Sequence, residues 1–421
     1  MTIDRPLTLP NGQRLPNRLA KSAMSERVAT PDGRPTPAHL RLYERWGGGG
    51  AGLLITGNVM VDGRAIGESG NVVVEDRRHL AELSAWARAA KAGGAKMWAQ
   101  INHPGRQSPR NLSKQPVAPS AVALKGAGPM FARPRALESE EIEDLVRRFA
   151  ATAAICEEAG FDGVQIHGAH GYLVSQFLSP RTNLRDDAWG GDAARRRRFL
   201  LEIVRAVRGA VSPGFAVGLK LNSADFQRGG FDEEESMAVL EAVDAEGLDL
   251  LEISGGTYES AKMFEETVPT RESSRAREAF FLDYAEQARA RVKTPLMLTG
   301  GFRTRDGMEH ALEGAVDVVG LARPLAAEPD LARRLLEGEA TRARPIRIAT
   351  GIANLDALVQ GAWYQVQIDR MGRGLEPDPG TTRLWAFLRY FLPRYAPAWA
   401  EAPTLQPHSA GDRAAPPPIA G

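Results

Sequence analysis

Eight short apolar segments recur along the chain, and each has the length of a β-strand. They cover residues 18–24, 51–57, 95–101, 161–167, 215–221, 248–254, 295–301 and 315–321. The later segments are apolar almost without interruption, which is typical of parallel strands that are covered on both faces. The pattern therefore predicts a buried parallel sheet.

Amphipathic stretches with helix signals lie between these segments. Residues 138–160 begin with an acidic turn and end at a glycine, and residues 232–247 also end at a glycine. Eight strands with intervening helices predict an α/β fold, a (β/α)8 TIM barrel, rather than an open doubly wound sheet.

The domain organisation follows from the absence of internal repeats and of an interior linker, so the barrel is expected to be a single domain. We assign residues 1–374 to this barrel. Residues 375–401 are expected to form a helical C-terminal extension. Residues 402–421 are small, polar and rich in proline, which predicts a disordered tail.

Two stretches outside the strand pattern need their own interpretation. Residues 102–135 form a long Pro/Gly/Ser-rich connection, and a loop of that length in a compact domain is usually functional. The glycine run "GGGGAG" at 47–52 has the spacing of a dinucleotide-binding loop. It follows a helical stretch and precedes a strand, however, whereas that fingerprint follows a strand and opens a helix. We interpret it as a helix end and a loop.

Charge and cysteine content exclude several functional classes. A net charge of +1, from 53 basic and 52 acidic residues, argues against nucleic-acid binding through a broad basic field. Cys156 is the only cysteine, so no thiolate zinc site or iron–sulfur cluster can be built, and a packed, inert thiol is expected. No signal-peptide pattern or bilayer-length apolar run is present. We therefore expect a cytoplasmic protein without a membrane partner.

The carboxyl ends of the predicted strands are marked by polar residues or glycines, and catalytic residues of such barrels collect at these ends. In strand order they are Met24 and Ser25; Gly57 and Asn58; Gln100, Asn102, His103 and Arg106; His167, His170 and Tyr172; Lys220 and Asn222; Ser254, Gly255 and Gly256; Thr299, Gly300 and Gly301; and Leu321, Ala322, Arg323 and Pro324. Eight such ends in register predict the active site at this face.

The last two strand ends indicate a phosphate site. Gly300 and Gly301 would let backbone N–H groups approach an anion, and Arg323 would supply the opposite charge. Loops after strands seven and eight form the common phosphate position of these barrels. Taken singly, each feature is also explained by a turn or by a surface arginine; together they favour phosphate.

His167 and His170 allow three interpretations. They could bind zinc, but the other strand ends offer no carboxylate as a third ligand and Lys220 would repel a cation, so no metal site is assigned. They could be imidazole N–H donors aimed at one oxygen, with Tyr172 as a proton donor. They could also simply pack. The strand-end position opposite a phosphate site favours the donor pair.

These residues occur in motifs that resemble the Old Yellow Enzyme family of FMN-dependent ene-reductases, over about residues 5–370. The matching motifs are "LPNRLAKSAM", "LLITGNV", "AQINHPGRQ", "VQIHGAHGYLVSQFLSPRTNLRDDAWGG", "KLNSADF", "LEISGG", "TGGFRT" and "GLARPLAAEPDL". The fourth of these motifs is the most specific.

The resemblance implies a noncovalent FMN across the barrel mouth and assigns residues to it. Lys220 matches the cation near flavin N1 and O2. His167 and His170 match the carbonyl-binding pair, and Tyr172 matches the proton donor. The isoalloxazine would be contacted by Ala23, Met24, Ser25, Gly57, Asn58 and Gln100, and the phosphate by Gly301, Ala322 and Arg323, with Gly300 beside them.

The implied reaction is a ping-pong reduction of an activated alkene. NADH or NADPH would reduce FMN, which would pass the hydride to Cβ of an α,β-unsaturated carbonyl compound while Tyr172 protonates Cα. Arg27 stands where one branch of the family has a tyrosine, and it is a candidate substrate-binding residue. Ser25 replaces that branch's redox-tuning cysteine, and Lys220 replaces the usual arginine.

Other functions stay open at this point. The same FMN barrel could act as an NADH oxidase or as a reductase of nitro compounds or nitroesters, or it could bind flavin without useful turnover. A flavin-free, metal-dependent barrel hydrolase belongs to a different class. The oligomeric state is open as well, a homo-oligomer included.

Overall fold

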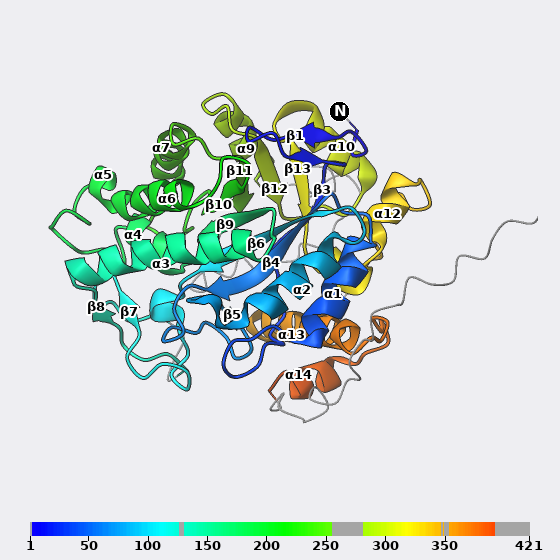
Figure 1. The fold of residues 1–421 in the computed structure, drawn as a ribbon, viewed down its shortest axis with the longest axis horizontal. Helices are drawn as coiled ribbons and strands as arrows, with labels where there is room; N and C mark the ends of the chain where they lie inside the picture. Colours follow the sequence, from blue (N-terminus) through cyan, green and yellow to red (C-terminus); the bar gives the residue numbers. More distant parts are fainter. Residues whose placement is uncertain (1, 126–129, 255–280, 347, 349–352, 392–421) are drawn as a thin grey trace, which may run out of the picture.

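Eight parallel strands close into a barrel in the computed structural model, which describes residues 2–125, 130–254, 281–346, 348 and 353–391. Each strand pairs in parallel with its neighbours, and β3 pairs with both β13 and β4, which closes the sheet. The predicted TIM barrel is confirmed (Figure 1). Its strands are β3 (Leu19–Lys21), β4 (Leu53–Met60), β6 (Lys96–Asn102), β9 (Gly163–Gly168), β10 (Ala216–Asn222), β11 (Leu250–Ser254), β12 (Leu296–Thr299) and β13 (Val318–Leu321).

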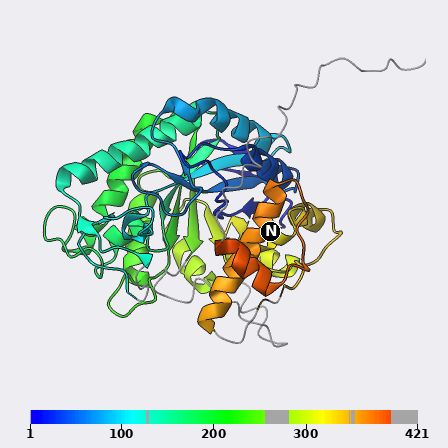
Figure 2. The ribbon, with the colours of Figure 1, turned by 90° about the horizontal axis from the view of Figure 1, so that it is seen from below.

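Helices surround the barrel, as the amphipathic stretches predict (Figure 2). The longest of them are α1 (Pro37–Gly47), α2 (Leu80–Lys91), α3 (Ser139–Glu158), α6 (Arg198–Ala210), α7 (Glu233–Asp244), α9 (Leu282–Arg289), α10 (Arg305–Gly314), α13 (Ala353–Gly372) and α14 (Arg383–Phe391). Shorter ones are η1 (Arg77–His79), η2 (Gly105–Gln107), α4 (Leu173–Leu178), α5 (Ala193–Arg196), α11 (Arg323–Ala327) and α12 (Leu331–Leu336).

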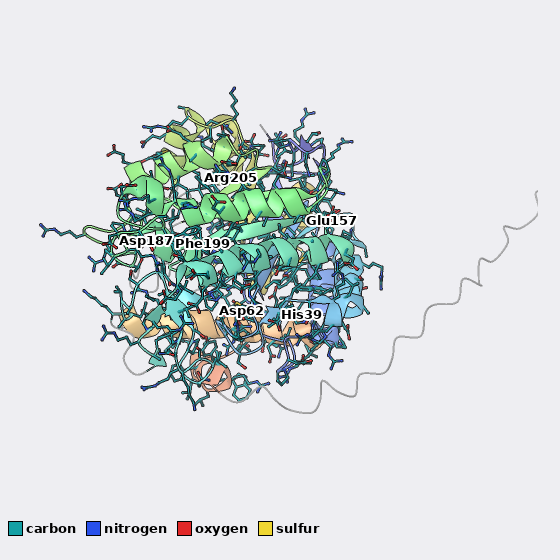
Figure 3. The ribbon with its side chains drawn as sticks, turned by 60° about the vertical axis from the view of Figure 1, so that its left-hand side comes forward. His39, Asp62, Glu157, Asp187, Phe199 and Arg205 are labelled. Carbon is teal, nitrogen blue, oxygen red and sulfur yellow. The ribbon has the colours of Figure 1, made fainter. Side chains whose placement is uncertain are left out.

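Helices α3 and α6 illustrate how this outer layer is held. Figure 3 shows them side by side, with Glu157 of α3 and Phe199 of α6 toward opposite ends of the pair. Phe199 packs on Phe177 of α4, with the two rings tilted by 34° and their centroids 4.2 Å apart. Cys156 lies fully buried in α3, which confirms the predicted packing, and burial raises the pKa of its thiol to about 12.

The barrel interior has two layers of side chains: an apolar lower layer, toward the amino ends of the strands, and a polar upper layer, toward their carboxyl ends. Because inward-facing side chains alternate along a strand, Trp98 and Gln100 both point inward from β6, as do Ala216 and Lys220 from β10. The lower layer is a cluster made by Ala20, Leu53, Ile55, Trp98, Ala216, Leu250, Met297 and Val318. The upper layer is therefore the floor on which a ligand at the carboxyl ends would rest.

A short N-terminal hairpin, β1 (Leu7–Thr8) with β2 (Arg14–Leu15), covers the opposite end of the barrel. Leu9 and Leu15 join the apolar cluster, and Trp98 Nε1 donates a hydrogen bond to Gln13 Oε1 at 3.0 Å. The amino ends of the strands are thus closed, which leaves chemistry to the carboxyl ends.

The C-terminal helices pack against one side of the barrel. α13 contacts α1 and α11, and α14 contacts α13 (Figure 1). Gln365 of α13 donates to the Glu26 carbonyl oxygen at 3.0 Å, which ties this layer to the loop after β3. α14 lies within the predicted extension 375–401, whereas residues 392–421, including the predicted tail, lie outside the described residues.

The glycine run 47–52 ends a helix, as expected. α1 finishes at Gly47, and a Cβ on Gly49 would lie 2.0 Å from the Pro329 carbonyl oxygen.

The long connection 102–135 carries β7 (Val117–Ala118), paired with β8 (Arg135–Ala136). Among the described residues, no helix is long and apolar enough to cross a membrane.

Two buried histidines, in addition to His167 and His170, make stability sensitive to acid. Burial lowers the pKa of His39 in α1 to about 3 and that of His103 after β6 to about 4, from an ordinary 6.5. Below pH 6.5 the unfolded chain therefore binds more protons than the folded chain, so the free energy of unfolding falls as pH falls.

We predict that His39 alone accounts for a loss of about 2 kcal/mol between pH 7 and pH 5. Urea unfolding at both pH values measures it. In His39→Asn, a side-chain oxygen can still accept the Thr36 N–H, which lies 3.0 Å from His39 Nδ1, but nothing titrates. The variant should lose about 2 kcal/mol less than the wild type; an identical pH dependence would contradict the assignment.

Candidate active site

The loop after β9 is held in a strained turn that presents His170. His170 has a φ of +60°, a left-handed conformation that costs a non-glycine residue on the order of 1 kcal/mol. The turn is fixed on both sides: the His170 N–H donates to Asn222 Oδ1 at 3.2 Å, and the His170 carbonyl accepts from Gln107 Nε2 at 3.0 Å. Gln107 belongs to the long connection, so that loop is anchored at the site.

The three predicted catalytic side chains come together. The His167 ring centroid lies 5.2 Å from that of His170 and 4.8 Å from that of Tyr172. Asn58 joins them, because the pairing of β4 with β6 shifts register between Ile55 and Asn58, and its Nδ2 donates to Tyr172 Oη at 3.4 Å. A cluster of donors and one phenol therefore lies at the barrel mouth.

Both imidazoles are neutral. Burial, followed by the proximity of His170 and Lys220, holds the pKa of His167 well below 6.5. Burial and Lys220 do the same for the pKa of His170. His167 Nδ1 accepts the Ala169 N–H at 3.3 Å, so its proton is on Nε2 and can be donated. His170 Nε2 is engaged, at 2.8 Å, by the Ser254 hydroxyl.

A continuous chain of buried side chains forms the upper layer of the barrel. Gln100 Nε2 donates to Gln165 Oε1 at 2.7 Å, and Gln165 Nε2 donates to Glu252 Oε2 at 2.7 Å. Glu252 Oε1 in turn lies 2.9 Å from Lys220 Nζ, with both side chains almost completely buried. Gln100 and Lys220, both expected to contact the flavin, are thus joined by two residues that sequence reasoning missed.

Glu252 corrects one expectation. A carboxylate does lie close to the site, directly opposite Lys220 in the pairing of β10 with β11, although no strand end carries one. Its signal was present as an acidic residue, one of two with Asp249, within the otherwise apolar segment 248–254. Within the described parts of the chain, no three His, Cys, Asp or Glu side chains are grouped so as to hold a metal ion.

The loop after β3 is pressed against Gly57. A Cβ at Gly57 would lie 2.4 Å from the Met24 carbonyl oxygen and 2.9 Å from Ser25 Cα, so only glycine fits. Glu26 Oε1 accepts the Gly57 N–H at 2.8 Å and also the Tyr43 hydroxyl. The predicted flavin contacts at these positions therefore share one surface.

Lys21 is another residue that sequence reasoning missed. It is fully buried, its Nζ donates to the Ile55 carbonyl at 2.8 Å, and it lies over the Trp46 ring at 4.5 Å. Burial lowers the pKa of Lys21 to about 8. The group fixes β3 against β4 and α1, and so positions the loop that follows.

The predicted phosphate residues meet on the opposite side of the barrel from β9. Gly300 and Gly301 have φ values of +137° and +86°, which glycine adopts readily. Arg323 begins α11 directly after Ala322, and its Nη1 donates to Gln360 Oε1 at 2.6 Å. A helix start, two glycines and a guanidinium are the groups that an anion requires.

Buried polar atoms without partners test whether the mouth fits a flavin. Asn58 Oδ1 and both amide atoms of Asn102 are buried and have no hydrogen-bond partner among the described residues. Such atoms indicate a polar ligand. A Cβ at Gly320 would lie 2.0 Å from Thr299 Oγ1 and 2.4 Å from Ser22 Oγ, so β13 needs glycine here to pack closely on these side chains. Hydrogen-bond donors on one side, the predicted phosphate residues on the other and a floor of polar side chains between them fit FMN.

Comparison with known proteins decides the family. The NADH:flavin oxidoreductase / NADH oxidase family model matches residues 3–342. The chain belongs to this family. The Old Yellow Enzyme resemblance is confirmed with it, and the protein is an FMN-dependent enzyme that is reduced by a nicotinamide cofactor.

Curated relatives and solved structures agree with this membership. The NADH-dependent flavin oxidoreductase iliE of Hypocrea jecorina is 40% identical over 79% of this chain and 88% of its own length. The NADH oxidase of Thermoanaerobacter brockii is 34% identical over 78% of this chain but only 50% of its own length. Morphinone reductase in complex with tetrahydroNAD is 28% identical with a TM-score of 0.68, covering 82% of this chain and 93% of its own.

The Lys220–Glu252 pair generates a prediction about bound FMN. Glu252→Gln removes a negative charge beside Lys220 but keeps an acceptor of similar shape. With Lys220 at the flavin, as the family resemblance implies, the unbalanced cation should raise the midpoint potential by about 30 mV, which is about 1.4 kcal/mol for a two-electron couple. Spectroelectrochemical titration measures the shift. Glu158→Gln, on the outer surface of α3, is the control, and an unchanged or lowered potential in Glu252→Gln would refute the role.

Proposed function

We propose that this Old Yellow Enzyme family member reduces the C=C bond of α,β-unsaturated carbonyl compounds with NADH, in a ping-pong reaction. The observation that supports the proposal is the cluster of neutral His167, His170 and Tyr172 at the barrel mouth. Bound FMN would supply the hydride chemistry. The protein's own groups supply position, polarisation and a proton.

His167 is the proposed donor to the substrate carbonyl. Its proton is on Nε2, and its neutral ring donates a hydrogen bond without bringing a buried cation beside Lys220. A donor aimed at the oxygen that gains charge lowers the barrier more than one aimed at the ground state. His170, fixed by Ser254 and Asn222, is assigned to the same oxygen from an almost perpendicular ring, at 84° to His167.

Tyr172 is the proposed proton source for Cα. Its oxygen accepts a hydrogen bond from Asn58 Nδ2 at 3.4 Å, which holds the hydroxyl at the barrel mouth. On the opposite rim, Gly300, Gly301, Ala322 and Arg323 are proposed to hold the flavin phosphate. Gln100, Lys220, Gly57, Asn58 and the loop from Ala23 to Ser25 would contact the ring.

The two half-reactions separate these roles. In Tyr172→Phe, oxidation of the reduced enzyme by cyclohex-2-enone should slow by about 100-fold, because a general acid is lost. Reduction by NADH should change little, because no proton is needed from this side chain. Anaerobic stopped-flow absorbance measures both steps.

Tyr284→Phe is the matched control. This tyrosine lies on α9, outside the barrel. It is also buried, and its hydroxyl forms a hydrogen bond with Ser236 Oγ at 2.6 Å. Its half-reactions should match the wild type. Equal slowing of both half-reactions in Tyr172→Phe would overturn the proton-donor role, and reduced enzyme that reacts with oxygen but with no enone would favour an NADH oxidase.

A further inference from the structure

Arg27 is held in an unusual backbone conformation close to the site. Its φ is +58°, and the described residues contain only two other non-glycine residues with positive φ, His170 and Phe226. Gly70 packs directly on its backbone, since a Cβ there would lie 2.5 Å from the Arg27 carbonyl oxygen. Strain that the surroundings enforce in this way is concentrated at functional positions.

Among the described residues, the guanidinium of Arg27 has a ring partner but no counterion. Its Cζ lies 4.5 Å from the ring centroid of Tyr390, which belongs to α14 in the C-terminal extension. Nε and Nη1 are shielded from solvent and have no hydrogen-bond partner among the described residues, and no described carboxylate lies within ion-pair distance. Leaving such buried donors unpaired is unfavourable, and an anionic ligand would supply the missing acceptor.

The position of Arg27 relates this unmet charge to the substrate. The preceding residue, Glu26, binds the Gly57 N–H, and the residue after Gly57, Asn58, binds Tyr172. Arg27 is thus fixed on the β3–β4 side of the mouth. The residues proposed to hold the flavin phosphate lie elsewhere: Gly300 and Gly301 follow β12, and Arg323, which donates to Gln360, follows β13. We therefore do not assign Arg27 to that phosphate.

We propose that Arg27 binds a carboxylate on the substrate and that Tyr390 positions its guanidinium by stacking. This inference rests on the proposed function and narrows it: the physiological alkene carries an anionic group in addition to the activating carbonyl. Arg27 supplies charge and two unpaired N–H donors to that group. The C-terminal extension thereby contributes to substrate selection.

A matched pair of substrates tests the assignment. (E)-4-Oxopent-2-enoate and its methyl ester carry the same enone and differ in one charge; because the ester also activates the alkene, each variant is compared with wild type on the same substrate. Wild-type enzyme should prefer the acid in kcat/KM. Arg27→Met should lower kcat/KM for the acid by about 10- to 100-fold, as for a lost charge-assisted hydrogen bond, and change the ester by less than about 3-fold. For Arg27→Lys, kcat/KM for the acid should lie between the values of the wild type and of Arg27→Met.

Variants of Tyr390 and of a distant arginine complete the design. Tyr390→Phe keeps the ring and should behave as wild type, whereas Tyr390→Leu should lose part of the preference for the acid. Arg77→Met removes an equal charge from the outer surface, where Arg77 pairs with Glu158, and should leave the preference unchanged. If Arg77→Met lowers the preference as much as Arg27→Met does, the effect is general electrostatics and the proposal fails.

Binding of a saturated analogue separates this inference from the proposed function. 4-Oxopentanoate cannot be reduced at a C=C bond, and its dissociation constant, read from the flavin absorbance, should rise at least about 10-fold in Arg27→Met. If neither alkene is reduced, the proposed function fails and this binding result alone decides the role of Arg27. Equal losses for acid and ester, or a raised KM for NADH with unchanged selectivity, would overturn the proposal.

Discussion

The ion pair between Lys220 and Glu252 is the constraint around which the barrel interior is organised. Neither charge could be buried alone without a cost of several kcal/mol, so each requires the other in the same layer. The remaining carboxylate oxygen of Glu252 is occupied by Gln165, which is bound by Gln100. Polar contacts therefore hold four strands, β6, β9, β10 and β11, in one register above the apolar lower layer.

That register also sets the chemistry at the mouth. Lys220 lies opposite His167 in the pairing of β10 with β9, and burial, helped by the charge of Lys220, holds the pKa of both histidines well below 6.5. A neutral His167 with its proton on Nε2 can donate to a carbonyl, and the strained turn at His170 brings Tyr172 beside it. The family membership and the buried network thus agree: the protein supplies fixed hydrogen-bond donors, and the flavin supplies electrons.

The sequence predicted the barrel because strand and helix periodicities are local, and all eight strands overlap the predicted segments. It also predicted His167, His170 and Tyr172 as a group, because they are neighbours in the chain. It did not reveal Gln165 or Glu252 as partners, since Gln100 and Gln165 are 65 positions apart and Gln165 and Glu252 are 87 apart. The stacking of Arg27 on Tyr390 joins opposite ends of the chain and could only be seen once α14 had been placed.

The destination of the hydride tests the assigned chemistry most directly. The measurement is turnover of cyclohex-2-enone with [4,4-2H2]NADH in ordinary water without oxygen, followed by mass spectrometry and NMR of the product. An ene-reductase with FMN at this mouth should place deuterium at Cβ of the saturated ketone and a solvent-derived proton at Cα. Oxidation of the nicotinamide without any deuterium at Cβ would contradict that assignment.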